Sequence, residues 1–301
     1  MGKIIATPGT KDCFTDIDGL KVGEAHDEQV NTGVTVIVPD KPVTMGVDVR
    51  GGGPGTRDTD ALDPTCLVEK VHGLVLSGGS VFGLAAADAV TAMLSEHHIG
   101  LSFGPRAIPV VPSAILFDLM NGGDKNWGET SPYYRLGKEA YLGLSDQVAL
   151  GRAGAGYGAT AGDQLGGLGV ASLETDSGLQ VSAIVAVNSF GKVTATPNDT
   201  HGVVDMPKLG FVGTNTTIGA VATNVALDKA ACKRLAMMAQ DGFARSIRPI
   251  HTPFDGDTVF AMSTGVMERD GELAPLLAVL GTLAADCMAK AIEKAVKASA
   301  G

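Results

Sequence analysis

The chain has 301 residues, 45% of them apolar, which is enough for one large domain or two small ones with a sizeable core. Its 23 Lys and Arg against 33 Asp and Glu give a formal net charge of −10, which argues against the cationic face that non-specific nucleic-acid binding needs. The cysteines are scattered without a C-x-x-C pair and predict neither a disulfide framework nor a zinc site: Cys13, Cys66, Cys232 and Cys287.

The sequence carries no recognisable targeting signal. Residues 1–16 lack the apolar segment of a signal peptide, and no uncharged apolar run approaches the ~20 residues of a membrane span. We therefore expect a cytoplasmic protein without a membrane or nucleic-acid partner. The 41 glycines are the unusual feature of the composition, and their clusters predict tight turns around a buried site.

The first part of the chain begins with two β-branched runs, at 34–39 and 43–50, which predict strands joined by a turn at 40–42. A glycine-rich loop with two arginines follows at 50–57. Its backbone amides would suit an anion, but it lacks the Gly-Lys-Ser/Thr ending of a phosphate loop. We therefore favour a tight structural turn near a pocket over a phosphate site.

The middle of the chain predicts a strand at 71–76 and a helix at 81–98 with Ser80 as its N-cap. A second helix is predicted at 133–144. Residues 151–159 contain a G-x-G-x-x-A spacing, but further glycines follow where a dinucleotide fold needs a long helix. This segment is therefore not expected to bind NAD.

The last part of the chain predicts strands at 180–187 and 257–264, with an exposed loop at 194–207. Two further helices are expected at 227–245, with Asp228 as N-cap, and at 273–298. Many apolar strands, four helices and no regular β-α alternation indicate one layered α/β domain over 1–301, with helices outside two packed sheets.

One stretch of the sequence combines reactive side chains with a buried strand. Asn215 and Thr216 lead directly into the uncharged, β-prone run 218–222, which is typical of a strand buried on both faces. If the Asn215–Thr216 bond were cut, Thr216 would carry a hydroxyl nucleophile beside its own α-amine as base. An ordinary turn that enters a core strand is the alternative.

Two acids and two amides could serve this threonine. Asp255 and Asp257 stand two residues apart, so an extended backbone would put both carboxyls on one side and raise one pKa. A solvated Asp-Gly-Asp turn is the alternative. Asn188 and Asn224 lie at or within apolar strands, where an amide either donates to a developing oxyanion or makes a strand-end hydrogen bond.

These residues carry a resemblance to a known family. The chain resembles the self-processing hydrolases typified by nylon-oligomer hydrolase (NylC), the D-aminopeptidase DmpA and the β-peptidyl aminopeptidases. The similarity covers nearly the whole chain, and its clearest blocks are 48–57, 76–80, 151–156, 215–218 and 255–258. Five blocks in the same order are far more specific than any single motif.

The resemblance implies a four-layer α-β-β-α sandwich like that of N-terminal-nucleophile (Ntn) hydrolases. It implies that the chain cuts its own Asn215–Thr216 bond into 1–215 and 216–301, and that the cleaved units form a homotetramer. Thr216 would be the nucleophile, the carboxyls of Asp255 and Asp257 would assist it, and Asn188 would lie beside it. No metal or organic cofactor is implied.

The resemblance also implies the substrate class. A threonine nucleophile and an aspartate pair are closer to NylC, so nylon-type 6-aminohexanoate oligomers or related small amides and peptides are expected. The Gly-Pro-Gly-Thr-Arg loop is closer to the aminopeptidase branch, which gives an aminopeptidase as the alternative. An uncleaved binding or regulatory protein and an acyltransferase are further alternatives.

The chain departs from NylC at two candidate pocket positions. Phe117 stands where NylC has a tyrosine, and Asp163 stands where it has a lysine, so the expected pocket loses a hydroxyl and a cation. Lys138 is the nearest upstream lysine and a weak substitute. These departures bear on the substrate more than on the fold.

Overall fold

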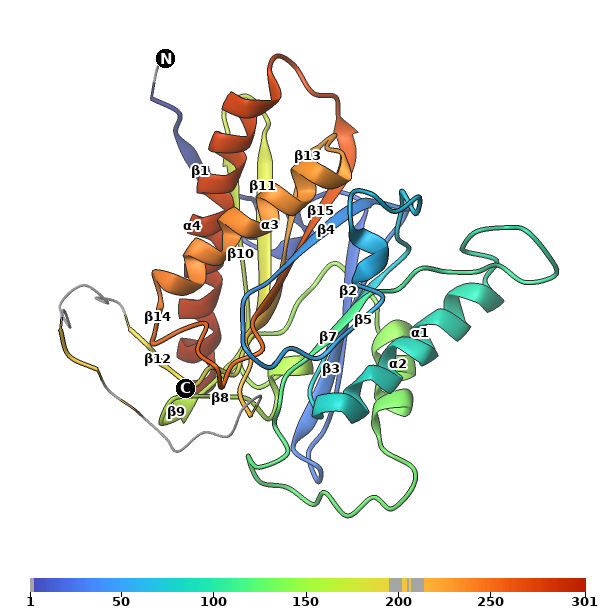
Figure 1. Ribbon diagram of the computed structural model, residues 1–301, viewed down its shortest axis with the longest axis vertical. Coiled ribbons are helices and arrows are strands. Elements are labelled where there is room, and N and C mark those ends of the chain that lie inside the picture. Colours follow the sequence, from blue (N-terminus) through green and yellow to red (C-terminus); the bar gives the residue numbers. More distant parts are fainter. Residues whose placement is uncertain (1–2, 195–201, 205, 207–213) are drawn as a thin grey trace.

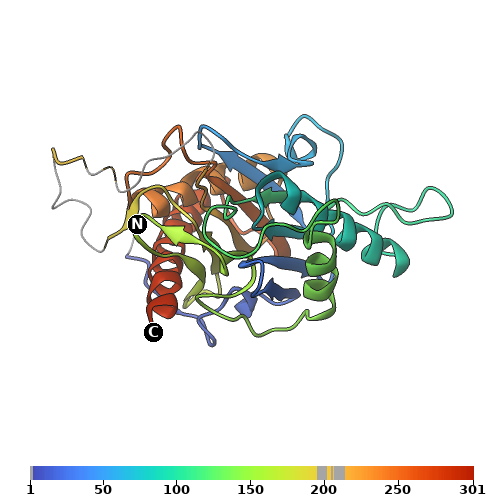
Figure 2. The same ribbon diagram turned by 90° about the horizontal axis from the view of Figure 1, so that it is seen from below.

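The computed structural model describes residues 3–194, 202–204, 206 and 214–301. Two sheets pack face to face, with a pair of helices on each outer side (Figure 1). Seen from below, α3 and α4 cover one side of the sheets, and α1 and α2 cover the other (Figure 2). The predicted four-layer α-β-β-α sandwich is confirmed.

The larger sheet has six strands, in the order β1 (Ala6–Pro8), β10 (Gly167–Thr175), β11 (Gln180–Val187), β13 (Ile218–Val225), β15 (Thr258–Met267) and β4 (Thr44–Val49). The smaller sheet has five, in the order β2 (Leu20–Asp27), β3 (Thr32–Pro39), β6 (Leu74–Ser77), β7 (Ser113–Ile115) and β5 (Thr56–Arg57). Two short ladders complete the described strands: β8 (Thr160–Ala161) pairs with β9 (Gln164–Leu165), and β12 (Lys192–Val193) pairs with β14 (Ile247–Arg248).

The four α-helices are α1 (Ala85–Glu96), α2 (Tyr133–Leu142), α3 (Lys229–Ala244) and α4 (Leu273–Ala300). Asp228 caps α3 as predicted, because its carboxylate accepts the N–H of Ala231 at 2.7 Å. α4 is also the one helix of the described residues whose length and composition would suit a membrane span. Its buried side chains, which include Met288 and Ile292, instead pack in the cluster between the helices and the larger sheet.

The side-chain alternation of β13 explains its continuous apolar sequence. Ile218, Ala220 and Ala222 point into the core between the two sheets, whereas Val221 and Val225 point into the cluster under α3 and α4. All five are at most 1% exposed. The prediction of a strand buried on both faces is therefore confirmed.

Of three local expectations, the first is confirmed, the second is wrong and the third falls mostly outside the described residues. The strands predicted at 34–39 and 43–50 belong to different sheets, so the turn between them crosses from one layer to the other. Ser80 is not an N-cap: it has φ +52° and begins a 3₁₀ helix (Ser80–Leu84), and α1 starts only at Ala85. Most of the loop expected at 194–207 lies outside the described residues.

The glycine-rich segment 151–159 forms a 3₁₀ turn (Gly154–Gly156) and not a long helix. Close packing explains its glycines. A Cβ on Gly156 would lie 2.2 Å from the main-chain nitrogen of Leu168, so no larger residue fits there. The segment therefore packs against β10 and has none of the helix that a dinucleotide site needs.

Candidate active site

The start of β13 and the turn before β15 meet at one edge of the larger sheet. The two strands are parallel, with Ile218 opposite Thr258, so the residues that precede them in the sequence lie at the same edge. The N–H of Thr258 donates to the carbonyl of Thr217 at 3.1 Å and extends this register. The turn 255–257 therefore lies beside Thr216, although the two are far apart in the sequence.

Thr216 is held by two hydrogen bonds, one from its hydroxyl and one from its main-chain nitrogen. Its side chain is buried, with 1% of the residue exposed, and its Oγ1 donates to the carbonyl oxygen of Asn215. Its N–H donates to the carbonyl of Asn188 at 2.7 Å. Asn188 follows β11, which is antiparallel to β13, and this pairing puts the end of β11 beside the start of β13.

Asp257 holds the main chain next to the nucleophile. Its Oδ1 accepts the N–H of Thr217 at 2.8 Å. Its Oδ2 accepts the N–H of His251 at 3.1 Å and lies 2.8 Å from Nδ1 of the same histidine. The carboxyl is completely buried, so each of its oxygens is bonded within the protein and not to solvent.

Asp255 is bonded to different partners. Its Oδ1 accepts the N–H of Phe190 at 2.9 Å. Its Oδ2 accepts the N–H of Thr252 at 3.1 Å and the Oγ1–H of the same threonine at 2.5 Å. Asp255 is also fully buried, which excludes the solvated Asp-Gly-Asp turn as an interpretation.

Burial sets the protonation of this carboxyl pair. Loss of solvent, and next the charge of Asp257, raises the pKa of Asp255 to about 6. A carboxyl with such a pKa can both accept a proton and return it near neutral pH. The pair thus has the acid–base chemistry that an attack by the Thr216 hydroxyl requires.

The glycine-rich loop forms a wall of the site. The N–H of Gly53 donates to the carbonyl of Asp255 at 2.8 Å. A Cβ on Gly51 would lie 2.3 Å from the nitrogen of Asp257, and a Cβ on Gly256 would lie 2.6 Å from Oγ1 of Thr216. These glycines permit three main-chain segments to meet around the hydroxyl, so the structure supports the interpretation as a structural turn beside a site.

The side chain of Asn188 links three further segments. Its Nδ2 donates to the carbonyl of Phe117 at 2.9 Å, and its Oδ1 accepts from Nδ2 of Asn121 at 3.1 Å and from the N–H of Thr160 at 2.9 Å. Phe117 therefore contributes its main chain to the surroundings of Asn188. The second hydrogen of the Asn188 Nδ2 has no protein partner among the described residues.

Sequence reasoning missed two residues near this site. His251 contacts Asp257, and its place four residues before Asp255 was the available signal. Asp118 is fully buried and accepts hydrogen bonds from Thr32 Oγ1 at 2.5 Å and from the N–H of Gly79 at 2.8 Å. Burial raises the pKa of Asp118, which follows Phe117 directly.

The remaining candidate residues lie away from Thr216 or on the surface. Asn224 lies near the opposite end of β13, where it bonds the N–H of Gln180 and the carbonyl of Gly178. Asp163 is exposed in the β8–β9 turn and pairs with Lys192 at 2.8 Å, so a lysine from another strand lies beside it. Lys138 is exposed on α2, outside the smaller sheet.

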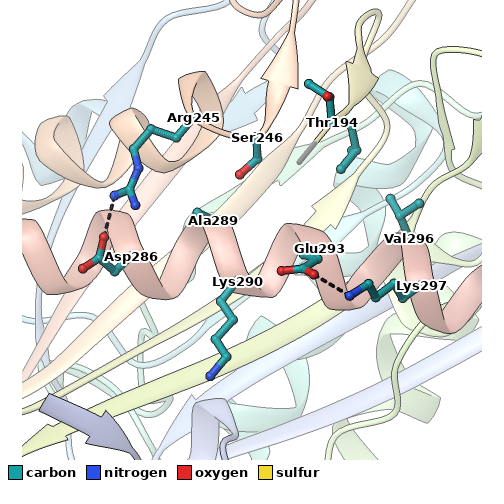
Figure 3. Close-up of a pocket in the computed structure, with 10 residues that line it drawn as sticks. Thr194, Arg245, Ser246, Asp286, Ala289, Lys290, Glu293, Val296 and Lys297 are labelled. Carbon is teal, nitrogen blue, oxygen red and sulfur yellow. Dashed lines mark hydrogen bonds and ion pairs between the residues drawn. The ribbon is translucent and has the colours of Figure 1, made fainter. Parts of the chain in front are cut away.

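A groove lies elsewhere on the chain. It encloses about 450 Å³ along α4, beside the end of α3 and β12, and Thr216 is not among its lining residues (Figure 3). Four of its five charged residues pair with one another: Arg245 bonds Asp286 at 2.5 Å, and Lys297 bonds Glu293. The groove therefore offers no unpaired charge from these four residues to a ligand.

In the part of the chain that the structure describes, no three or more His, Cys, Asp or Glu side chains are grouped to hold a metal ion. All four cysteines are free thiols.

Solved structures with the same fold define the class of protein. A β-aminopeptidase from Burkholderia sp. matches with a TM-score of 0.75 over 98% of this chain and 88% of its own, at 22% identity. An L-aminopeptidase D-Ala-esterase/amidase from Ochrobactrum anthropi, described as a variant of the Ntn hydrolase fold, matches with a TM-score of 0.74 over 97% and 88%, at 22% identity. The fold is that of the Ntn-hydrolase-type aminopeptidases.

The sequence profile of peptidase family S58 matches residues 12–300, and the chain belongs to this family. An uncharacterized aminopeptidase of Mycobacterium leprae is 40% identical, over 95% of this chain and 90% of the relative. A 6-aminohexanoate-oligomer endohydrolase of Kocuria sp. is 27% identical, over 97% and 88%. The protein is therefore a hydrolase that acts on amide bonds, and its substrate is a small peptide or amide.

Proposed function

We propose that the chain is a self-processing amide hydrolase whose nucleophile is Thr216. One observation carries the proposal: Oγ1 of Thr216 is hydrogen-bonded to the carbonyl of Asn215, at the edge of the sheet where two buried carboxyls meet. A hydroxyl against the carbonyl of its own preceding peptide, with acid–base groups beside it, is suited to intramolecular acyl transfer.

The first reaction is the cleavage of the chain itself. Oγ1 adds to the carbonyl carbon of Asn215, and its proton passes to the Asp255/Asp257 pair. The C–N bond then breaks, the pair returns the proton to the nitrogen of Thr216, and an ester joins Asn215 to Oγ1. Water hydrolyses this ester, which leaves a carboxylate on Asn215 and a free amine and hydroxyl on Thr216.

The second reaction uses the new amine. An α-amine has a pKa near ~8, so a useful fraction is neutral at pH 7 and can take the Oγ1 proton. The hydrogen bond from the Thr216 nitrogen to the carbonyl of Asn188 supports a fixed position for this base. Oγ1 attacks the substrate amide, an acyl-enzyme forms as the amine leaves, and water releases the acid. The second hydrogen of Asn188 Nδ2 is suited to the oxyanion.

For the substrate, we propose peptides or small amides with a free amino end, as an aminopeptidase would take. The support is the higher identity to an aminopeptidase, 40%, than to a 6-aminohexanoate-oligomer endohydrolase, 27%, over similar shares of the chain. Nylon-type oligomers are the second candidate, because the nucleophile and both carboxyls are those of NylC by the sequence resemblance. We further propose a tetramer of cleaved units, which light scattering would check.

The test is the intact mass under denaturing conditions. Two fragments of about 22 and about 9 kDa, the smaller one beginning at Thr216, are expected in place of the 30.6 kDa chain. Thr216→Ala should remain one inactive chain, whereas Thr216→Ser keeps a hydroxyl and should still be cut. Cleavage of Thr216→Ala at the same bond would refute the proposal. An intact, inactive wild-type chain would favour a binding protein.

A further inference from the structure

Among the residues that the structure describes, His251 is the one imidazole that contacts the carboxyl pair. Its ring Nδ1 lies 2.8 Å from Oδ2 of Asp257, and its main-chain N–H donates to the same oxygen at 3.1 Å. The other oxygen of Asp257 accepts the N–H of Thr217. One carboxylate thus connects the histidine to the residue that follows the nucleophile.

The ring of His251 is held in one orientation. Its backbone has φ +56°, a left-handed conformation that is uncommon for residues other than glycine and that the surrounding structure must hold in place. The ring packs nearly parallel to that of Phe243 on α3, with centroids 6.1 Å apart. Nε2 is buried and has no hydrogen-bond partner among the described residues. With Oδ2 of Asp257 as the acceptor, Nδ1 is assigned as the donor of this hydrogen bond.

The two carboxyls differ in their donors. Asp257 accepts from the N–H of Thr217 and twice from His251, whereas Asp255 accepts from Phe190 and Thr252. The nearby cation is engaged elsewhere: the guanidinium of Arg50 bonds Asp48 at 2.7 Å and the carbonyl of Met237. His251 is therefore the one ring donor, in the part of the chain that the structure describes, that distinguishes the two acids.

We propose that His251 is a positioning residue, which orients Asp257 and the main chain at Thr217 and so directs the proton released by Oγ1 of Thr216 to Asp255. The inference rests on the proposed function, since it assigns parts within that site. In it, Asp257 holds the backbone, and Asp255 receives the Oγ1 proton and returns it to the leaving nitrogen. Without the imidazole, the proton would be shared between both acids.

The first variant is His251→Asn, because asparagine tolerates a left-handed backbone and keeps the main-chain donor while the ring is removed. His98→Asn is the matched control: His98 has φ +59° and is exposed at the end of α1. Self-cleavage of His251→Asn should slow on the order of ten- to a hundredfold, as for the loss of a hydrogen bond to a charged group. The control should cleave at the wild-type rate.

The second readout is the pH profile of kcat/KM for the cleaved enzyme. The apparent pKa of the acidic limb should shift in His251→Asn and remain unchanged in His98→Asn. A merely structural effect would lower kcat/KM without this shift. Wild-type cleavage rates and an unchanged profile in His251→Asn would overturn the inference and leave the proposed function standing. An uncleaved, inactive wild-type chain would instead remove the proposed function itself.

A second variant covers the case in which His251→Asn does not fold. His251→Gly suits the left-handed backbone and leaves space for free imidazole. Added imidazole should restore self-cleavage of this variant and have no effect on His98→Gly. A folded His251→Gly chain that cleaves at the wild-type rate without imidazole would contradict the role.

Discussion

The carbonyl oxygen of Asn188 accepts the main-chain N–H of Thr216 at 2.7 Å. This bond joins the end of β11 to the start of β13 and connects the candidate nucleophile to the buried side-chain network of Asn188. On the proposed mechanism the same nitrogen becomes an α-amine, so its anchor exists before the amine does. The position of residue 188 should therefore control both cleavage and turnover.

Asn188→Ala tests this anchor. The change removes the side-chain bonds to Phe117, Asn121 and Thr160 and leaves buried polar groups unpaired. We expect a loss of stability on the order of 2–4 kcal/mol, measured by urea unfolding, and slower self-cleavage. Stability and cleavage both equal to the wild type would show that the segment is held by other contacts.

Gly256→Ala tests the close approach to the hydroxyl. A Cβ at this position would lie 2.6 Å both from Oγ1 of Thr216 and from the carbonyl oxygen of Gly53, so both neighbours or the turn itself must move. We expect cleavage to slow on the order of a hundredfold, since small displacements of a reacting atom have effects of this size. Gly104→Ala is the control, because its Cβ would meet nothing within 4 Å, and it should be cleaved normally.

The pKa of Asp255 predicts a pH dependence of stability. Because that pKa is raised from 3.8 to about 6, the folded chain keeps a proton that the unfolded chain releases between these values. The contribution of this carboxyl to stability should therefore be greatest below about pH 4 and fall by on the order of 3 kcal/mol as the pH rises to about 6. Urea unfolding of Thr216→Ala and of Thr216→Ala/Asp255→Asn separates this effect from cleavage. The double variant should lose that part of the slope, and an identical slope in both chains would contradict the assignment.

Asn224→Ala tests the residue that the structure separates from the site. Its amide joins Gln180 and Gly178 near the far end of β13. We expect a loss of about 1–2 kcal/mol in unfolding free energy, with self-cleavage at the wild-type rate after correction for folded protein. A loss of self-cleavage in a fully folded variant would show that Asn224 does take part in the reaction.

The elements were readable from the sequence because their cause is local. The apolar run 218–222 and the cap at Asp228 depend on neighbouring residues, and both appear where they were expected. The site depends on pairing between distant strands. Asn188 and Asn224 look alike in the sequence, and only the antiparallel register of β11 and β13 puts the first beside Thr216 and the second far from it.

Two further features had no local signal. Gly79 and Ser80 both have a left-handed backbone. A Cβ on Gly79 would lie 2.0 Å from the ring of Tyr133, a residue distant in the sequence. His251 reads as an ordinary loop residue until the parallel pairing of β13 with β15 brings Asp257 to Thr217. The backbone at Ser80 and the position of His251 beside the site therefore depend on contacts between segments distant in the sequence, and not on residue type.

The strand order of the larger sheet has a consequence for the two pieces that cleavage would produce. β13 and β15 would belong to 216–301, yet they lie between β11 and β4, which would belong to 1–215. Both polypeptides would thus contribute strands to one sheet. Their separation would require every hydrogen bond between β11 and β13, and between β15 and β4, to break. The cut would change the covalent chain and leave the folded body whole. In native size-exclusion chromatography the protein should therefore elute at the same volume before and after cleavage. The two fragments should separate only in denaturant.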